Sequence, residues 1–453
     1  MKERSNFTSK IGFVLAAAGS AVGLGNLWRF PYLAAKHGGG TFLLAYLILA
    51  VTFGFALMIA EIAIGRKTGL SAIGAYKALD KRFGFVGVLT SLVPIIILPY
   101  YSVIGGWVIK YFVTFISGNI TASADDSFFG GFIGQPLEPL SWFFLFIALT
   151  AIIVLFGVEK GIEKVSKIMM PILAVLTVGI AIFVVTRPGA WSGVVYYIKP
   201  NFKDFSFTTI LAAMGQLFYS MSLAMGIMVT YGSYMKKDNN LESSVRQIEL
   251  FDTAIAFLAG LMIVPAAYMF FDGSTEGLKK GPTLMFVILP KVFNEMGTTA
   301  GTIIGVAFFL LVFFAALTSS ISLMETVVSI VMDKTKLGRK TTCIIVALFS
   351  LLMGIPSSLG FSVWSHILPL GQDLLTFFDF ISNSVLMPIV AFFTCVLIGF
   401  ILKPKSVIDE VKVTDGKFKS EKLFVVMIKW IAPIFILAIL AFSVAEGMGW
   451  ISV

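Results

Sequence analysis

Residues 19–30 read Gly-Ser-Ala-Val-Gly-Leu-Gly-Asn-Leu-Trp-Arg-Phe and lie within an apolar segment, Ile11 to Ala35, that is long enough to cross a bilayer as one helix. Its three glycines each cost about 1 kcal/mol relative to Ala inside a helix. An Asn and an Arg follow at once, and polar side chains within a membrane usually have a function. Unwound backbone is tolerated in a membrane only where protein or water satisfies its polar groups. The stretch therefore predicts a membrane helix that is broken at mid-depth to build a binding site.

The composition of the whole chain agrees with a membrane protein. Of its 453 residues 58% are hydrophobic and 13% are charged, and the mean hydropathy is +0.94. These values exclude an ordinary soluble domain. The net charge of +9 does not indicate nucleic-acid binding, because most Lys and Arg residues lie in alternate short loops beside apolar runs. Cys343 and Cys395 both lie in apolar segments, so no disulfide framework is predicted.

Hydropathy and helix breakers predict an all-α polytopic protein with eleven transmembrane helices. The expected spans are residues 9–35, 41–66, 85–113, 141–157, 165–186, 207–235, 243–271, 301–333, 341–359, 374–402 and 424–445. Loops 66–84, 158–167, 236–246, 334–340 and 403–422 are rich in Lys and Arg, whereas loop 114–140 has none. The positive-inside rule then predicts a cytoplasmic N-terminus in a cell (inner or plasma) membrane. An odd number of spans places the C-terminus outside.

The sixth expected span contains a second interruption. Residues 216–226 read Gln-Leu-Phe-Tyr-Ser-Met-Ser-Leu-Ala-Met-Gly, which sets hydroxyls and a glycine within an apolar run. Interrupted segments at matching positions of two oppositely oriented halves are typical of inverted-repeat transporters with a site at the membrane midplane. The predicted units are a first repeat at 1–203 (helices 1–5), a second repeat at 204–405 (helices 6–10), and helix 11 with a short tail at 406–453. This division rests on topology, because no repeat is visible residue by residue.

Several motifs, in order along the chain, resemble those of the neurotransmitter:sodium symporter family. Gly19–Pro31 followed by Gly38–Phe42 is similar to the first-helix signature, and residues 216–225, residues 317–321 and Asp379 continue the likeness over nearly the whole chain. The likeness is to bacterial amino-acid transporters with the leucine-transporter fold. It implies a 5+5 inverted repeat with broken helices 1 and 6, and Na⁺-coupled symport by alternating access. It implies no enzyme activity.

The resemblance implies two Na⁺ sites built from oxygen ligands, which hard cations prefer. The first would use the Ala21 carbonyl, Asn26, Ser220 and Asp252, and the substrate carboxylate would complete it. The second would use the carbonyls of Gly19, Val22 and Ala315 together with Thr318 and Ser319. An alternative for the two hydroxyl residues of the second site is ordinary back-bonding to a carbonyl one turn earlier.

Asp252 lies in the apolar segment 250–256, where an unpaired carboxylate would be costly. One alternative is an acid at the cytoplasmic helix end, near Glu249 and Arg246. Chloride-dependent animal members resemble Asn at the position of Asp252 with Ser one turn later, where this chain has Ala256. We therefore expect the Asp252 carboxylate to supply the negative charge itself, so that transport needs no chloride.

The resemblance places an amino-acid substrate between the two breaks. The N–H groups of Leu24 and Gly25 begin the outer half-helix, whose positive end suits a carboxylate. Tyr101 is similar to the tyrosine that holds this carboxylate, although core packing is an alternative. Gly23 leaves room for it, whereas amine-transporting relatives resemble this stretch with Asp there. The other residues expected around the substrate are Ala21, Ile97, Phe218, Tyr219, Ser220, Ser222, Met225, Ser319 and Leu323.

This apolar wall with few hydroxyls and an adaptable Met favours neutral L-amino acids with hydrophobic or aromatic side chains. A symporter for small neutral amino acids is the alternative within the same class. A second class is an amino-acid-binding membrane sensor without turnover, which uptake measurements would separate from a symporter. A third is an ion channel, which would show a continuous polar stripe through several spans, whereas only two local breaks are visible. The sequence does not indicate an oligomeric state.

Two ion pairs are expected to act as gates. Arg29 and Asp379 would close the outer side, and Arg4 and Asp333 would close the inner side. The alternative for each is a surface ion pair worth about 0–1 kcal/mol. Phe7 stands where the family usually has Trp beside the inner pair, and this difference weakens the expected inner latch.

Overall fold

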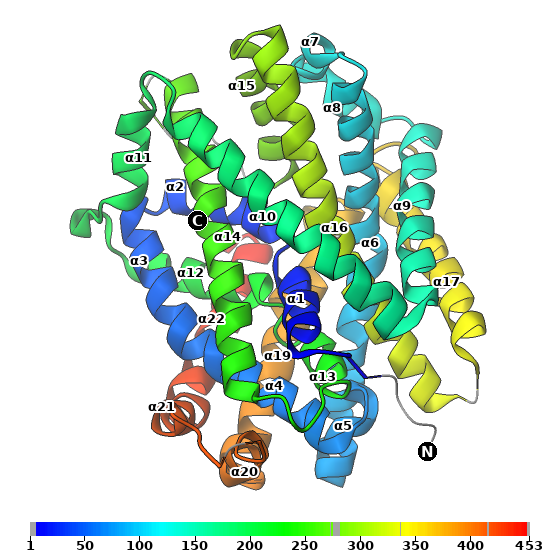
Figure 1. Cartoon of the computed structure of the whole chain (residues 1–453). Helices are drawn as coiled ribbons and strands as arrows, with labels where there is room; N and C mark the ends of the chain where they lie inside the picture. The colour runs from blue at the N-terminus through cyan, green and yellow to red at the C-terminus, as the bar shows by residue number, and fades with distance from the viewer. Residues whose placement is uncertain (1–5, 272, 275–280, 336, 415, 451–453) are drawn as a thin grey trace.

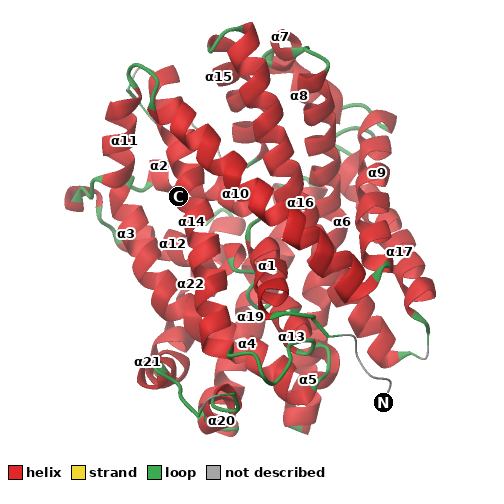
Figure 2. Cartoon of the chain, in the orientation of Figure 1, coloured by secondary structure: helices red, strands yellow, loops and turns green. Residues whose placement is uncertain are grey.

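The computed structural model describes residues 6–271, 273–274, 281–335, 337–414 and 416–450. Over these residues the regular elements are helices (Figure 2), apart from one isolated β-bridge between Gly39 and Pro200. The first helix packs against three of the long helices, and the all-helical class predicted from hydropathy is confirmed (Figure 1).

The helices of the first half are α1 (Lys10–Ala21), α2 (Phe30–Lys36), α3 (Gly40–Leu49), α4 (Phe55–Thr68), α5 (Ala72–Leu79), α6 (Gly84–Ile116), α7 (Ile120–Ser123), α8 (Asp126–Ile133), α9 (Leu137–Leu155), α10 (Lys164–Val185) and α11 (Ala190–Ile198). Those of the second half are α12 (Phe207–Ser220), α13 (Ile227–Gly232), α14 (Leu241–Phe270), α15 (Leu289–Glu295), α16 (Thr298–Lys334), α17 (Arg339–Leu359), α18 (Leu374–Asp379), α19 (Met387–Val396), α20 (Lys405–Val411), α21 (Glu421–Val426) and α22 (Ala432–Gly447).

Shorter segments with other helical hydrogen bonding complete these elements. The π-helical segments are η1 (Gly25–Arg29), η2 (Ala50–Gly54), η4 (Val158–Glu163), η6 (Leu284–Ile288), η8 (Phe380–Leu386), η9 (Leu397–Ile401) and η10 (Met427–Ile431). The 3₁₀ turns are η3 (Lys81–Phe83), η5 (Phe202–Asp204) and η7 (Pro369–Gly371). Most π-helical segments continue directly into an α-helix, so they widen a span without ending it.

Nine helices of the described chain are long and apolar enough to cross a membrane. They are Gly40–Thr68, Lys81–Ile116, Leu137–Leu155, Val158–Val185, Leu241–Phe270, Thr298–Lys334, Arg339–Leu359, Leu374–Ile401 and Glu421–Gly447. A tenth span is the bent pair Lys10–Ala21 and Gly25–Lys36, whose two halves meet at 53°. The sixth expected span, 207–235, corresponds to α12 and α13, each too short to cross alone, which residues 221–226 separate. Both predicted interruptions are therefore present.

Capping residues define where the broken spans begin. The Ser9 side chain accepts a hydrogen bond from the Gly12 N–H at the start of α1, and the Ser206 side chain accepts one from the Thr209 N–H at the start of α12. Serine is favoured at this position because its oxygen satisfies one of the free N–H groups of the first turn. The α1 helix ends at Ala21, and the next residue, Val22, is extended with φ of −72° and ψ of 101°.

The two ends of the bundle carry different loops. Figure 1 shows α5, α20 and α21 at one end and α7, α8 and α15 at the other. Because α5 and α20 lie within two of the Lys- and Arg-rich loops, we call this end the basic end. The α1 half of the first broken span lies nearer the basic end, and α2 lies nearer the opposite end (Figure 1).

Candidate functional site

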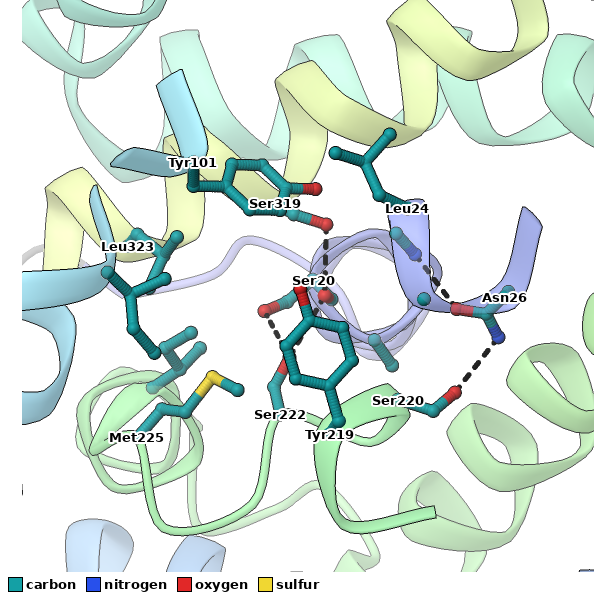
Figure 3. Close-up of a pocket in the computed structure, with 15 residues that line it drawn as sticks. Ser20, Leu24, Asn26, Tyr101, Tyr219, Ser220, Ser222, Met225, Ser319 and Leu323 are labelled. Carbon is teal, nitrogen blue, oxygen red and sulfur yellow. Dashed lines mark hydrogen bonds between the residues drawn. The ribbon is translucent and has the colours of Figure 1, made fainter. Parts of the chain in front are cut away.

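The two interruptions lie against each other at the centre of the molecule. The Ser20 hydroxyl donates to the Ser222 hydroxyl at 3.2 Å, and the Ser222 hydroxyl donates to the Ser20 carbonyl at 3.0 Å. The Gln216 side-chain amide donates to the Gly25 carbonyl at 3.0 Å. These contacts join residues about two hundred positions apart, so the two broken spans satisfy part of each other's freed backbone. Figure 3 shows the contacts between Ser20 and Ser222.

The glycines of the first break allow close approach. A Cβ at Gly23 would lie 2.9 Å from the Ser319 Oγ and 3.3 Å from the Tyr101 hydroxyl. A Cβ at Gly25 would lie 2.6 Å from the ring of Tyr219. Neither glycine has a positive φ. Side chains from α6, α12 and α16 therefore occupy the space that a larger residue would need.

A small cavity, here called the central cavity, lies between the breaks. Its walls consist of Ser20, Ala21, Gly23, Leu24, Gly25, Asn26, Ile97, Tyr101, Tyr219, Ser220, Ser222, Met225, Ile227, Ser319 and Leu323. Every residue expected around a substrate is among them except Phe218. Figure 3 shows the hydroxyls of Tyr101 and Ser319 on one side of the cavity and Met225 on another.

Phe218, which was expected in this wall, does not line the central cavity in this structure. Its ring packs on Phe53 with centroids 6.2 Å apart, and it lines a second, wider cavity. Phe218 therefore lies on the side of the wide cavity, whereas the neighbouring Tyr219 lines both cavities. Ile227 takes a place in the wall that the sequence did not predict, because it depends on how the chain leaves the second break.

The two cavities differ greatly in size, and Tyr219 lines both of them. The central cavity encloses about 30 Å³, which is room for about two water molecules. The wide cavity encloses about 660 Å³ and is lined by α2, α6, α12, η8 and α22. The Arg29 guanidinium lies 5.5 Å from the centroid of the Tyr219 ring. Tyr219 therefore separates the cavities, and side chains must move to admit an amino acid.

Asp252 lies at the centre of a buried polar cluster behind the first break. Its carboxylate accepts hydrogen bonds from the Asn26 side-chain amide at 2.8 Å, the Ser220 hydroxyl at 2.9 Å and the Tyr46 hydroxyl at 3.3 Å. Asp252 and Asn26 are completely buried. Asp252 thus contacts Asn26 of the first break, whereas Arg246 lies 3.7 Å from Glu249.

This cluster contains three of the four protein ligands expected for the first Na⁺ site. Asn26 and Ser220 also line the central cavity, as does Ala21. The Asn26 side-chain oxygen accepts from the Gly23 N–H at 3.0 Å, and its amide group faces Asp252. The residues are therefore close enough to share an ion, and turning the Asn26 amide would add its oxygen to those of Asp252 and Ser220.

The second expected Na⁺ site lies where α16 meets the first break. The Ser319 hydroxyl lies 3.4 Å from the carbonyl oxygens of both Gly19 and Val22. The Thr318 hydroxyl donates to the Phe314 carbonyl at 2.9 Å and lies 3.2 Å from the Ala315 carbonyl. Thr318 thus back-bonds as the alternative predicted, whereas Ser319 faces the break. All the converging atoms are oxygens, a donor set that suits a hard cation.

The two acids expected at the gates accept hydrogen bonds from neighbouring side chains. The Asp379 carboxylate accepts from the Tyr100 hydroxyl at 3.0 Å and the Asn383 amide at 2.6 Å. Among the described residues Arg29 is not paired with Asp379, so the expected outer ion pair is not formed here. Both residues line the wide cavity, which lies between their helices. The Asp333 carboxylate accepts from the Ser71 hydroxyl at 2.6 Å, and Arg4 lies outside the described residues.

A multi-pass helical protein in which two interrupted spans enclose an oxygen-rich cavity has the architecture of a secondary transporter. Comparisons with known proteins define it further. The model of the "Sodium:neurotransmitter symporter family" matches residues 4–127 and 133–449. The "Uncharacterized sodium-dependent transporter YhdH" of Bacillus subtilis is 35% identical over 444 residues, which is 96% of each protein. An "Uncharacterized sodium-dependent transporter" of Haemophilus influenzae is 33% identical over 459 residues, covering 97% of this chain and 98% of that protein.

Among solved structures, that of MhsT in complex with L-phenylalanine is 38% identical and superposes with a TM-score of 0.87. The match covers 97% of this chain and 100% of that chain. The chain therefore belongs to the sodium:neurotransmitter symporter family. It is a sodium-dependent membrane transporter and not an enzyme, as the first-helix motif predicted.

Proposed function

We propose that the protein is a Na⁺-coupled symporter of neutral L-amino acids, with a preference for hydrophobic or aromatic side chains. The observation that carries this proposal is the wall of the central cavity, which contains no Asp, Glu, Lys or Arg among its described residues. A charged substrate side chain would be buried there without a partner, at a cost of several kcal/mol. The L-phenylalanine in the MhsT structure supports the same substrate class.

One end of the central cavity is suited to a substrate carboxylate. The Tyr101 hydroxyl is buried and has no hydrogen-bond partner among the described residues. It lies beside the space that Gly23 leaves free, near the start of the η1–α2 half-helix. A carboxylate at this point would accept from Tyr101 and meet the positive end of that half-helix. Gly23 thus favours an amino acid over an amine.

The other end of the central cavity is suited to an apolar side chain. Ile97, Met225, Ile227 and Leu323 line it from α6, the second break, α13 and α16. Met has three flexible bonds and fills spaces of different shape, so Met225 can retract to admit a larger ring. Small neutral amino acids remain the alternative, because the cavity is narrow before such a movement.

We further propose two Na⁺ sites at the two oxygen clusters. The first shares Asn26 and Ser220 with the central cavity, so a bound carboxylate can complete it. Sodium and substrate then stabilise each other's binding, and this coupling is reciprocal. Two Na⁺ ions moving down a tenfold gradient and 100 mV would supply roughly 7 kcal/mol, at ~2.3 for each charge and ~1.4 for each tenfold gradient.

Transport should not need chloride, because Asp252 supplies the negative charge beside the first ion cluster. Replacing Asp252 with Asn removes this charge but keeps the hydrogen-bonding shape. We expect uptake by this variant in proteoliposomes to fall about tenfold or more in gluconate buffer, and added chloride to restore part of it. Chloride-stimulated uptake by the wild-type protein would contradict the proposal.

The transport cycle would expose the central cavity to each end of the bundle in turn. With the basic end in the cytoplasm, as the loop charges favour, the wide cavity is the outer vestibule. Its closure would bring Arg29 and Asp379 together above Tyr219, and Arg4 with Asp333 would close the basic end. The repeats at 1–203 and 204–405 would move relative to each other, with 406–453 as an addition.

Uptake by the purified protein in proteoliposomes tests the proposal. An inward Na⁺ gradient should drive accumulation of a labelled neutral amino acid, and a K⁺ gradient should not. Competition by Leu, Tyr, Trp, Ala and Gly then ranks the substrates, with the large side chains expected to compete best. Na⁺-dependent binding without uptake would favour the sensor, and strongest competition by Ala and Gly would favour the small-substrate symporter.

A further inference from the structure

A carboxylate from another span holds the start of α1. Glu163 is the last residue of η4, at the beginning of the span Val158–Val185. Its side chain is 2% exposed. It accepts hydrogen bonds from the Thr8 N–H at 2.7 Å, the Thr8 hydroxyl at 2.5 Å and the Ser9 hydroxyl at 3.1 Å. The two residues that lead into α1, including its N-cap Ser9, are therefore bonded to a residue about 155 positions away.

The local structure of α1 is adapted to this contact. The Ser9 hydroxyl caps the helix by accepting from the Gly12 N–H at 3.1 Å, and it donates to Glu163 at the same time. A Cβ at Gly12 would lie 2.0 Å from the Glu163 Oε1. Glycine at position 12 is thus the residue that lets the carboxylate lie along the helix. The positive end of α1 also favours a negative charge at this place.

The residue before this contact is attached to a different element. The Phe7 N–H donates to the Tyr234 carbonyl at 3.2 Å, and the Phe7 ring packs edge to face on Tyr231 with centroids 5.5 Å apart. The segment entering α1 is therefore fixed both to the end of the second broken span and to η4. Movement of α1 away from the bundle must break both attachments.

The helix that carries Glu163 can change shape there and keeps a counter-ion for the carboxylate. The η4 segment is π-helical, follows Gly157 with a φ of +84°, and leads into α10. Short π-helical segments are frequent at functional sites. Lys167 lies one turn further on, with its ammonium 2.7 Å from the Glu163 carboxylate and its side chain 39% exposed. Glu163 would therefore keep a partner if Thr8 and Ser9 moved away.

We propose that Glu163 is a positioning residue that latches the α1 half of the first broken span to the start of the fifth span, and so keeps the basic end closed while ions and substrate are bound. The inference rests on the proposed alternating-access function. The other end of α1 carries the Gly19 and Val22 carbonyls of the second ion cluster. A latch at the first turn of α1 thus fixes the position of these ligands, and opening the basic end requires its three hydrogen bonds to break.

The test combines a Glu163→Gln variant with a reporter on α1. Ala17 is fully buried in α1, so an Ala17→Cys substitution reports exposure of this helix to a charged, membrane-impermeant thiol reagent. Cys343 and Cys395 are buried, and the parent protein measures their background labelling. Removing the charge weakens hydrogen bonds that are stronger when the acceptor is ionised. We expect alkylation without Na⁺ to be about three- to tenfold faster in the Glu163→Gln background.

The Na⁺ concentration for half-maximal substrate binding should rise by a similar factor in Glu163→Gln, and saturating Na⁺ should return alkylation to the parent rate. A Glu159→Gln variant is the matched control, since this carboxylate lies on the same segment η4 but is exposed. It should leave both quantities unchanged. A Gly12→Ala variant displaces the Glu163 carboxylate while keeping its charge, and it should reproduce the effect of Glu163→Gln.

Parent-like alkylation and Na⁺ dependence in a folded Glu163→Gln protein would overturn the latch. If that variant does not fold, the Gly12→Ala protein decides by the same criteria. Equal acceleration by Glu159→Gln would also overturn it, because the effect would then be a general loss of negative charge from η4. Failure of the proposed transport function is separate, since it would be seen as absent Na⁺-driven uptake by the parent protein, whatever the alkylation rates.

Discussion

The breaks in the first and the sixth span face the same cavity but are built differently. In the first break, Gly23 and Gly25 have negative φ, and they serve to bring neighbouring side chains close. In the second break, Ser222 has a φ of 52° and Ala224 a φ of 59°, and Gly226 follows with 73°. Left-handed backbone is unfavourable for residues other than glycine, by about 1–3 kcal/mol each. The first break is thus permitted by its own residues, whereas the second must be held in place.

Contacts with two other helices hold the second break. The buried Glu61 carboxylate of α4 accepts from the Ala224 N–H at 2.6 Å. The Ser222 hydroxyl donates to the Ser20 carbonyl in the first break at 3.0 Å. Because the strained residues depend on partners in other spans, the shape of the second break should respond to movements of α1 and α4. Substitutions in the first break should instead affect the site mainly through the size of the side chain that they add.

The largest effect is expected from adding a side chain to the first break. A Gly23→Asp substitution puts a Cβ 2.9 Å from the Ser319 Oγ and adds a carboxylate to an uncharged wall. We expect amino-acid uptake in proteoliposomes to fall about a hundredfold or more, because an unpaired buried charge is very unfavourable. Gly130→Ala is the matched control, since a Cβ there meets no atom within 4 Å. Uptake that survives Gly23→Asp would show that the substrate carboxylate does not lie beside Gly23.

The same contrast explains how far the sequence could predict this site. Glycine costs helix stability in any context, so residues 19–25 predicted a break without further information. Ser222 and Ala224 have no intrinsic preference for the left-handed conformation, and the contact with Glu61 that fixes them lies about 160 positions away. The region of the second break was therefore predicted, but its strained residues were not. Likewise, Ile227 lies in the cavity wall because of the path by which the chain leaves the second break, and the sequence did not predict that path.

An intermediate effect is expected from releasing the second break. Glu61→Ala leaves the buried Ala224 N–H without its acceptor, at a cost of about 1–3 kcal/mol. We expect the dissociation constant of the substrate, measured with labelled ligand at saturating Na⁺, to rise roughly ten- to a hundredfold. Glu61→Gln retains a carbonyl oxygen that can accept from Ala224, so its loss should be smaller. Equal losses in the two variants would indicate that the charge of Glu61 matters more than its hydrogen bond.

The smallest effect is expected from introducing glycine into each broken span. This experiment tests directly whether the backbone of the second break is strained. Ala224→Gly removes one buried methyl group but relieves the left-handed strain, so the free energy of unfolding should change by less than about 1 kcal/mol, in either direction. Ala17→Gly removes a similarly buried methyl group from the regular helix α1 and adds the glycine penalty of about 1 kcal/mol. Thermal unfolding of the two variants in one detergent should therefore rank Ala224→Gly as the more stable. The reverse order would mean that the second break is as relaxed as the first, and that Glu61 supports the site in some other way than by holding a strained backbone.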